Sequence, residues 1–472
     1  MERSPFKIER VATALNLKRE RAGKASDFNV QCPFCSNGKK EYKLNIDTIK
    51  DVWKCPKCGN KGGTLQLYAF VAHGIDSEAY FALSKECRSE IYKELCQLLG
   101  DNETGVKQVK RPAYNPQPEI PCSPVASDTE LNKAYTALMR LDAFSLSPEH
   151  RENLLKRGLS KKVIEENGYR TIPNDLAPII SSKIKKEYDD GGWEAIRRKN
   201  PDFAKIKREE IVAGITVAEF LQSKGIRVEG VPGFFKFGER WCFRLIRGMF
   251  IPTRNRFGQI VGAQVRKETG DAKYLTVSSK NYPYGVREGI VRVHFPLHNA
   301  AITKDTKIIV TEGPLKADIA MFLQREDQPT AFMAIQGISN TSALQVELEA
   351  LKEAGLNGVN IWNALDMDRI TNRNVRSGSL KIKQVVLDAG FKMPQLLWDS
   401  LYAKTEITRL KELCKENDIP YTQSSGNVFS EFANLCILLE KYEVEHHPKP
   451  MANWNPATKG IDDYLLQVSK GR

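Results

Sequence analysis

The chain has 472 residues, of which 41% are hydrophobic and 27% charged, and its formal net charge is +13. This length is too great for one ordinary core and predicts about three domains, while the positive charge favours a polyanion such as nucleic acid over a small neutral ligand. The N-terminus lacks the apolar segment of a signal peptide, and no stretch reaches the roughly 18 apolar residues of a membrane span, so we expect a cytoplasmic protein with no membrane partner.

Two pairs of cysteines near the N-terminus have the spacing of a zinc ribbon. Cys32-Pro-Phe-Cys35 and Cys55-Pro-Lys-Cys58 are separated by 19 residues, and the stretch between them can form a β-hairpin. One such pair alone could be a redox motif or a coincidence, but two at this spacing in a reducing compartment favour a metal. We predict one structural Zn²⁺ bound by the four thiolates, in a zinc-ribbon β domain of residues 1–100.

Lysines and aromatic residues surround these cysteines. Such a mixture of positive charge and rings is typical of surfaces that bind single-stranded nucleic acid, although a solvated lysine face without a ligand is the alternative. The rings are Tyr42 and Trp53, and the lysines are Lys39, Lys40, Lys43, Lys50, Lys54, Lys57 and Lys61.

A polar stretch rich in proline follows the first domain. Residues 101–128 contain Pro112, Pro116, Pro118, Pro121 and Pro124. Prolines among polar residues predict an extended linker. The second unit, residues 129–306, begins with helical sequence and becomes strand-rich from Trp241 to Val277, so we predict a mixed α+β subdomain.

The strand-rich part of this second unit is strongly basic. The acidic residues between Gly233 and Lys280 are only Glu239, Glu268 and Asp271. The basic residues are Lys236, Arg240, Arg244, Arg247, Arg254, Arg256, Arg266, Lys267, Lys273 and Lys280. Because arginine binds two phosphate oxygens at once, the cluster predicts contacts to phosphates, although any single arginine is weak evidence.

Strands and helices alternate in the third unit, residues 307–472, apart from an insertion at about residues 399–450. The expected strands end at Glu312, span Ala331 to Ile335, end at Asp366 and span Gln395 to Trp398. Their alternation with helices predicts a parallel sheet covered by helices. One apolar strand leads into Glu312, and a second leads into Asp366 and Asp368. If the strands are neighbours, the three carboxylates meet at one edge of the sheet, where oxygen ligands suit Mg²⁺ or Mn²⁺ and chemistry on phosphates.

Three stretches together resemble the bacterial-type DnaG-like DNA primases, in the smaller form found in phages and mobile elements. The second cysteine pair with Lys61-Gly-Gly-Thr64 is similar to the ribbon of that family. The other two stretches are the basic sequence from Met249 to Leu275, similar to the RNA polymerase motif, and Glu312-Gly313 with Asp366-Met-Asp368, similar to the TOPRIM signature.

The resemblance implies a DNA-directed RNA polymerase that makes short RNA primers from ribonucleoside triphosphates on a single-stranded DNA template. Glu312, Asp366 and Asp368 would be catalytic and would hold magnesium, with Glu312 either completing the metal shell or accepting the proton of the attacking hydroxyl. The residues expected to bind substrate or template are Arg254, Arg266, Lys273 and Tyr274.

The same resemblance adds a fourth carboxylate late in the chain. Lys459-Gly-Ile-Asp462 is similar to the Gly-x-Asp motif of TOPRIM sites, so Asp462 is a further candidate ligand for magnesium. The alternative is an ordinary helix start, at which an acidic residue interacts favourably with the helix dipole.

Two departures bear on the biological setting. The stretch Arg369 to Asn374 replaces the small residues usual in the family and is more similar to TOPRIM proteins of plasmids and phages. No Gly-x-x-x-x-Gly-Lys-Ser/Thr sequence occurs, so we expect any replicative helicase to be a separate partner protein.

Other functions share the same acidic motifs. A TOPRIM-type nuclease would use the carboxylates to activate water, and a type IA topoisomerase would need a nucleophilic tyrosine domain, which nothing in the sequence marks. A non-catalytic zinc-ribbon adaptor that binds single-stranded DNA is the third alternative, and it is favoured if the carboxylates do not converge.

Overall fold

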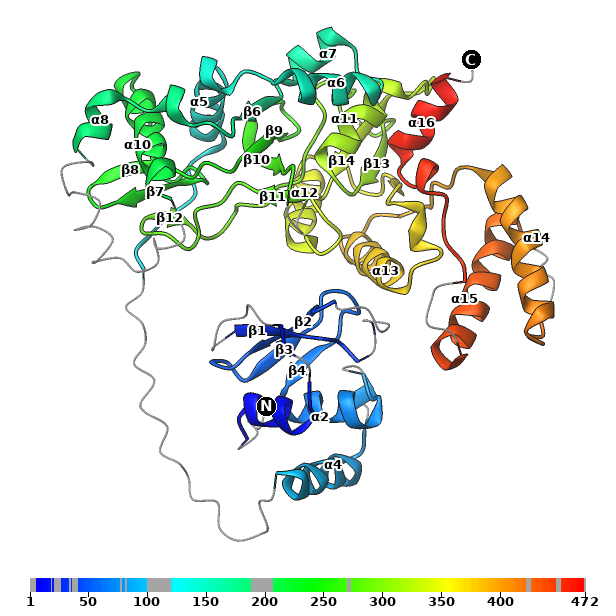
Figure 1. The fold of residues 1–472 in the computed structure, drawn as a ribbon. Helices are drawn as coiled ribbons and strands as arrows, with labels where there is room; N and C mark the ends of the chain where they lie inside the picture. Colours follow the sequence, from blue (N-terminus) through cyan, green and yellow to red (C-terminus); the bar gives the residue numbers. More distant parts are fainter. Residues whose placement is uncertain are drawn as a thin grey trace. The chain divides into compact units, whose positions relative to one another are not determined.

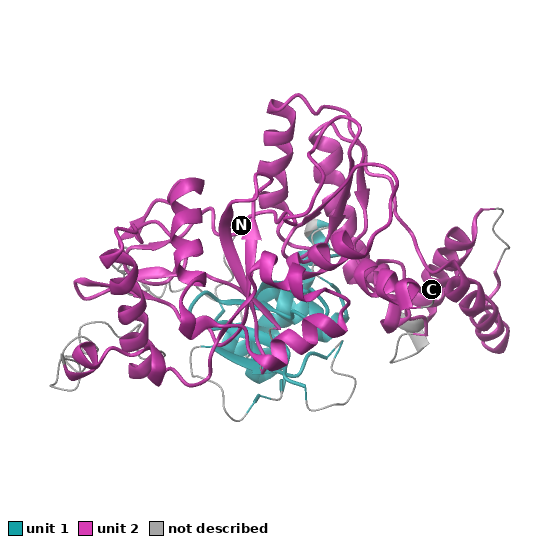
Figure 2. Ribbon diagram, turned by 90° about the horizontal axis from the view of Figure 1, so that it is seen from above, with its two compact units in different colours: residues 1–115 teal, residues 116–472 magenta. Residues whose placement is uncertain are grey.

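The computed structural model describes residues 6–17, 19–20, 27–33, 35, 41–76, 79–80, 83–99, 120–187, 207–269, 273–421, 426–446 and 451–470. The chain divides into two compact units, residues 1–115 and 116–472 (Figure 2). This division falls within the predicted linker, whose residues 101–119 lie outside the described part, and the finer domain limits stay predictions. None of the described helices combines the length and apolar character that crossing a bilayer requires.

The first unit is a small antiparallel sheet with helices. The sheet has the order β1-β2-β3-β4, and the predicted hairpin between the cysteine pairs is β2 and β3. The elements are α1 (Ile8–Ala14), β1 (Asp27–Val30), β2 (Leu44–Asp47), β3 (Val52–Lys54), β4 (Lys61–Gly63), α2 (Thr64–His73) and α4 (Lys85–Leu98).

Glycines let β4 turn directly into α2. A side chain at Gly62 would place its Cβ 2.6 Å from Cβ of Gln66, so only glycine fits there. The amide of Gly63 donates to Oε1 of Gln66 at 2.9 Å and caps the helix. Beneath this turn Trp53 stacks on Phe70 with ring centroids 4.8 Å apart and is almost fully buried, so it belongs to the core and does not present its ring to nucleic acid.

The second unit begins with helices packed on an antiparallel sheet. The sheet has the order β11-β10-β9-β6, and β7 pairs with β8 nearby. Its elements are β5 (Cys122–Ser123), α5 (Asp128–Met139), η1 (Asp142–Phe144), α6 (Pro148–Lys156), α7 (Lys161–Asn167), β6 (Arg170–Ile172), η2 (Ala177–Ile179), α8 (Ser182–Glu187), α10 (Arg208–Ser223), β7 (Phe234–Phe237), β8 (Arg240–Phe243), β9 (Gly248–Arg254), β10 (Ile260–Arg266), β11 (Tyr274–Thr276) and β12 (Gly285–Val286).

The remainder of the second unit is built on a parallel sheet of the order β14-β13-β15. Isolated parallel bridges at Lys392 and Gln395 extend it, and of these two residues only Gln395 lies in the predicted strand Gln395 to Trp398. Its elements are β13 (Lys307–Thr311), α11 (Pro314–Leu323), β14 (Thr330–Ala334), α12 (Thr341–Glu353), β15 (Ile361–Asn363), η5 (Met367–Arg369), α13 (Arg373–Asp388), α14 (Ser400–Glu416), α15 (Val428–His446), η6 (Pro456–Thr458) and α16 (Ile461–Lys470).

Both faces of the parallel sheet are buried. Along β13, Ile308 and Val310 enter the core formed with α12 and α13, and Ile309 enters the core on the side of α11 and α16 (Figure 1). Burial on both faces explains why the strand is a continuous apolar run and does not alternate with polar residues. The predicted fold class, mixed α+β with a zinc-ribbon-like domain and a parallel sheet, is confirmed.

Candidate active site and zinc centre

The four predicted zinc ligands meet at one point. The sulfur atoms of Cys32, Cys35, Cys55 and Cys58 all lie within 4.8 Å of one another, and among the described residues no other group of His, Cys, Asp or Glu side chains is gathered so closely. Gly59, at a φ of 78°, closes the second knuckle, and its amide donates to the carbonyl of Cys55 at 2.9 Å. The sulfur of Cys35 lies 3.4 Å from that of Cys55, and the sulfur of Cys32 lies 3.8 Å from that of Cys58. A closed set of four sulfurs suits a structural zinc ion.

The lysines near the ribbon have mixed surroundings. Lys57 pairs with Glu41 at 2.7 Å, and Lys50 pairs with Asp47 at 3.5 Å. Lys39 and Lys40 lie outside the described residues. Since Trp53 is buried, Tyr42 alone among the two predicted rings is partly exposed. The predicted nucleic-acid surface of this unit therefore rests on its charge more than on stacking.

The carboxylates predicted from the sequence converge at one edge of the parallel sheet. Strands β13 and β15 are parallel neighbours, and the amide of Ala364 continues the pairing by donating to the carbonyl of Val310 at 2.9 Å. Glu312 directly follows β13, and Asp366 and Asp368 follow β15. The sequence predicted that the carboxylates meet if the two strands are neighbours, and in the structure they are.

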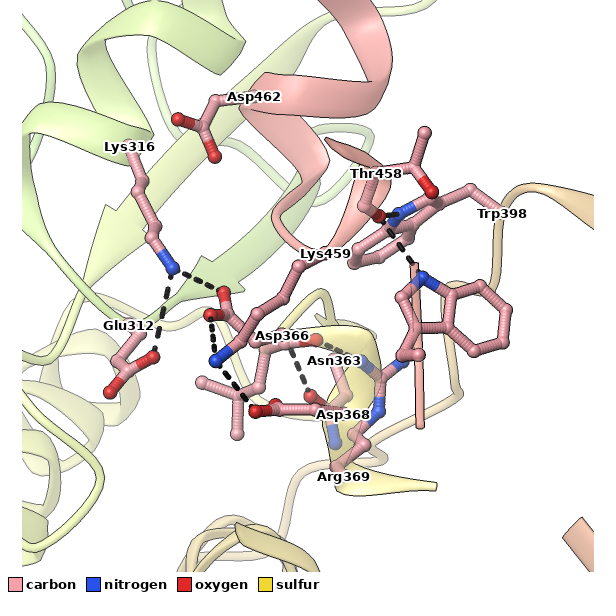
Figure 3. A network of polar contacts seen from close by, with 12 residues as sticks. Glu312, Lys316, Asn363, Asp366, Asp368, Arg369, Trp398, Thr458, Lys459 and Asp462 are labelled. Carbon is pink, nitrogen blue, oxygen red and sulfur yellow. Dashed lines mark hydrogen bonds and ion pairs between the residues drawn. The ribbon is translucent and has the colours of Figure 1, made fainter. Parts of the chain in front are cut away.

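Two lysines lie among these carboxylates (Figure 3). Lys316 forms an ion pair with Oδ1 of Asp366, and its Nζ lies 3.8 Å from Oε2 of Glu312. Lys459 lies 2.6 Å from Oδ2 of Asp368 and 3.6 Å from Oδ2 of Asp366. Each oxygen of Asp366 thus faces a different ammonium group.

Burial and charge shift the pKa values of these groups. Burial raises the pKa of Glu312, and the neighbouring carboxylate of Asp366 raises it further. Burial works to lower the pKa of Lys316, but the carboxylates of Asp366 and Glu312 outweigh it, so the pKa is raised and the lysine stays charged. The same balance with Asp368 and Asp366 raises the pKa of Lys459.

A buried arginine shapes the loop that carries Asp366 and Asp368. The guanidinium of Arg369 donates to the carbonyl of Leu365 and, at 2.8 Å, to the carbonyl of Leu396. Its burial lowers the pKa of Arg369 to about 10, so the side chain remains cationic at neutral pH. Arg369 therefore fixes the backbone of the loop that carries Asp366 and Asp368 through these two hydrogen bonds.

Asp462 lies near the other carboxylates but has a partner of its own. Its Oδ2 accepts a hydrogen bond from Arg157 at 2.5 Å, while its Oδ1 is buried and has no hydrogen-bond partner. A Cβ at Gly460 would lie 2.4 Å from that Oδ1, so a larger residue there would displace the side chain of Asp462. The close packing of Gly460 against Asp462 explains the glycine of the Gly-x-Asp sequence. The side chain of this segment that contacts Asp366 and Asp368 is that of Lys459 and not that of Asp462.

The predicted substrate residues separate into two groups. Arg266 donates to Oδ1 of Asn153 at 2.6 Å, and Tyr274 is 37% exposed. Lys273 lies close enough to this group that its pKa is lowered, first by burial and then by the positive charges of Arg266, Arg157 and Lys316. These cations together, named here the cationic cluster, are Arg157, Arg266, Lys273 and Lys316.

Arg254 lies apart from this cluster. Its side chain is 4% exposed, and its guanidinium donates to the carbonyl of Asn167 at 2.7 Å. Burial lowers the pKa of Arg254, and Asp318 acts in the opposite direction. The structure thus gives Arg254 a place in the core between β9 and α7, without a surface that phosphate could reach.

The residues present fit a divalent ion. The atoms at the sheet edge that could bind a metal are the carboxylate oxygens of Glu312, Asp366 and Asp368, the kind of ligand that Mg²⁺ and Mn²⁺ prefer. Oδ1 of Asp368 is buried without a hydrogen-bond partner. The fit is incomplete in one respect, because Glu312, Asp366 and Asp368 do not form a ready cage of the kind that the four cysteines form.

Sequence reasoning did not anticipate three residues of this site. Lys316 follows Glu312 by four positions at a helix start, so helical spacing could have indicated that the two side chains meet. Nothing local marks Lys459 or Arg157, since each reaches the acidic residues from a segment distant in the sequence.

Comparison with known proteins finds solved structures of primases at low sequence identity. No protein-family model matches it, and no curated protein does. The Aquifex aeolicus primase, with zinc-binding and RNA polymerase domains, is 14% identical over 93% of this chain and 96% of that chain, at a TM-score of 0.35. A DnaG primase catalytic domain bound to single-stranded DNA is 16% identical over 73% of this chain and 98% of that chain, at a TM-score of 0.33.

A third structure comes from Mycobacterium tuberculosis. The RNA polymerase domain of its primase DnaG, in complex with a double-stranded DNA oligomer that has a 6-nucleotide overhang, is 11% identical over 73% of this chain and 98% of that chain, at a TM-score of 0.34. All three structures are of primases, and two of them are named DnaG.

Proposed function

We propose that this chain is a DNA primase, which synthesises short RNA primers from ribonucleoside triphosphates on single-stranded DNA. The observation that carries the proposal is the meeting of opposite charges in the second unit. Carboxylates gather at the carboxyl edge of the parallel sheet, and the cationic cluster lies beside them. A triphosphate needs both, because cations bind its phosphates and carboxylates bind the divalent ion that accompanies it.

The cationic cluster would bind the triphosphate of the incoming nucleotide. Burial and then the positive charges of Arg266, Arg157 and Lys316 lower the pKa of Lys273. The ion pairs of Arg157 with Asp462 and of Lys316 with Asp366 offset part of this repulsion. An anion relieves that repulsion, so the cluster is suited to a polyphosphate. Tyr274 lies next to Lys273 with an exposed ring, which offers a surface on which a base can stack.

Asp366, Asp368 and Glu312 would hold Mg²⁺ or Mn²⁺, which supplies positive charge to the phosphates during transfer. Glu312 would either complete the shell of that ion or accept the proton of the attacking 3′ hydroxyl. Asp462, which accepts a hydrogen bond from Arg157, would fix the position of that arginine in the cationic cluster.

The first unit would bind the DNA template. A four-cysteine zinc site is closed and structural, and the lysines around it give the positive charge that a DNA backbone attracts. The setting that we propose is the replication of a phage, plasmid or other mobile element in the cytoplasm, with a separate replicative helicase as partner. The sequence Arg369 to Asn374 supports that setting.

Primer synthesis can be assayed with single-stranded DNA, the four ribonucleotides and Mg²⁺ or Mn²⁺. We expect short RNA products from the native chain and a loss of at least about 100-fold for Asp366→Asn, which removes charge from the metal site. Asp305→Asn removes an exposed carboxylate in the turn before β13 and should leave synthesis unchanged. Shortened DNA without RNA products would instead identify a nuclease, and binding without either product would identify an adaptor.

A further inference from the structure

The carboxylates of the candidate active site are already neutralised in part by lysines of the chain itself. Lys316 occupies the space between Glu312 and Asp366, and Lys459 lies between Asp366 and Asp368 (Figure 3). Three carboxylates therefore face two ammonium groups. The two ammonium groups leave about one negative charge among the three carboxylates, and the buried cation of Arg369 acts on Asp366 and Asp368 as well. A single divalent ion more than balances what remains.

Both lysines are held in place by structure around them. Lys316 belongs to α11, which begins at Pro314 directly after Glu312. The backbone of Lys459 accepts a hydrogen bond from the amide of Met367 at 2.9 Å, next to Asp366. The preceding carbonyl, of Thr458, accepts hydrogen bonds from the indoles of Trp398 at 2.7 Å and Trp454 at 3.2 Å. The segment that carries Lys459 is thus anchored in the core.

The two lysines differ in their surroundings. The side chain of Lys316 is 26% exposed, against 42% for Lys459. Lys316 is attracted by Asp366, Glu312 and Asp462, whereas Lys459 is attracted by Asp368 and Asp366 and is repelled by Lys316. Lys316 is therefore the more firmly held of the two.

The side of Lys459 also offers ligand atoms. Oδ1 of Asp368 is buried and accepts no hydrogen bond, and the flexible ammonium of Lys459 can withdraw toward solvent. An entering ion gains the oxygens of both aspartates there. On the other side, an ion would have to displace the enclosed Lys316.

We propose that Lys316 takes the place of a second divalent ion between Glu312 and Asp366, so that the nucleotide-free protein binds one ion, at Asp366 and Asp368, from which Lys459 withdraws. The role follows from the proposed function, since the fixed charge of Lys316 would then act on the transferred phosphate as a second ion would.

The test is the number of Mn²⁺ ions bound by the full chain, loaded with zinc and free of nucleotide, measured from the electron paramagnetic resonance of free Mn²⁺. The native protein should bind one ion. Lys316→Met should bind two ions, because the second position loses its cation. Lys459→Met should still bind one ion, at least about tenfold more tightly, because no ammonium competes for it.

Three control variants make the result specific. Lys316→Arg keeps the charge and should bind one ion. Lys352→Met removes a lysine from an exposed ion pair with Glu349 and should behave as the native chain. The double variant Asp366→Asn with Asp368→Asn should bind none, which places the ion at those residues.

Two ions in the native protein, or one ion of unchanged affinity in Lys316→Met, would contradict the proposal. So would an ion that persists in the double aspartate variant. If Lys316→Met does not fold, the native protein and Lys316→Arg still test the proposal. Two ions bound to either of them would show that Lys316 does not take the place of a second ion. The ion count does not depend on catalysis, so a chain that binds Mn²⁺ as expected but makes no RNA would contradict only the proposed primase activity.

Discussion

At the scale of single residues, Lys273 separates substrate binding from the chemistry at the carboxylates. It belongs to the cationic cluster but contacts none of the three acidic residues at the sheet edge. We therefore expect Lys273→Gln to raise the KM for ribonucleotides about tenfold and to change kcat much less, since it removes one charged contact to phosphate.

Steady-state kinetics of RNA synthesis at varied nucleotide concentration would measure this effect. Lys280→Gln removes an exposed lysine at the end of the same basic stretch and serves as the matched control. Equal changes of kcat and KM in the two variants would show that Lys273 contributes only general charge.

The sequence indicated the acidic side chains because their chemistry depends on short motifs at strand ends. It did not indicate the lysines, because Lys459 meets Asp368 only through the tertiary fold. Arg254 shows the converse limit. A basic strand predicts phosphate contacts on average, but which arginine turns inward depends on the helix that packs there, here through the carbonyl of Asn167.

At the scale of elements, the ion pair of Arg157 and Asp462 joins the end of α6 to the first turn of α16. Asp462 is almost completely buried, so removing Arg157 leaves an unpaired charge in the core. Arg157→Met should lower the free energy of unfolding by about 3 to 5 kcal/mol. Adding Asp462→Asn should restore most of that loss, because the buried charge is removed as well.

Denaturant unfolding of the two single variants and the double variant measures the coupling. Arg151→Met, which removes an exposed partner of Glu165, is the control and should change stability by about 1 kcal/mol or less. Additive losses in the double variant would mean that the two side chains do not interact as the structure places them.

The contact between α6 and β6 should depend on pH. Nδ1 of His150 lies 2.8 Å from Oγ1 of Thr171, and burial lowers the pKa of His150 below its ordinary value of 6.5. The unfolded chain therefore binds the proton first as pH falls through 6.5, and folding stability is lost from there down to the lower folded pKa.

His150→Gln should flatten this part of the profile, because glutamine does not titrate. Thermal unfolding between pH 7.5 and 5 compares the variant with the native chain. Glu268 lies 3.4 Å from Nε2 of His150 and favours the charged form, so Glu268→Gln should lower the folded pKa further and steepen the native dependence. Parallel profiles for native protein and His150→Gln would contradict the assignment.

Among the elements, alternation and apolar runs sufficed to predict β13, β14 and β15 and the helices between them. The stretch from Gln395 to Trp398 reads as a strand but forms only isolated bridges. The sequence pattern also did not predict that Trp53 is buried, because an aromatic residue among lysines is equally suited to stacking on a base or on another ring. The packing of α2, which places Phe70 against Trp53, decides between these two arrangements.

At the scale of the whole molecule, the two units should respond differently to loss of metal. The first unit has a small sheet whose turns are closed by the four cysteines, so we expect it to unfold when zinc is removed. The second unit has its own large cores and should keep its fold.

Calorimetry with and without a strong chelator would show this as the loss of one of two transitions, together with about one zinc released per chain. Cys55→Ser should reproduce the loss, while Cys87→Ser, at an exposed cysteine outside the cluster, should leave both transitions. Retention of both transitions in the chelated protein would contradict a structural metal.

The central claim, that opposite charges in the second unit serve nucleotide polymerisation, is tested most directly by the mass of the products. Purified full-length chain with single-stranded DNA, ribonucleotides and Mg²⁺ or Mn²⁺ should yield short RNA that begins with a 5′ triphosphate and grows by whole nucleotides, as seen by mass spectrometry. Asp366→Asn should yield none. Unchanged DNA with no RNA from the native chain, or DNA fragments whose formation depends on Asp366, would contradict the account.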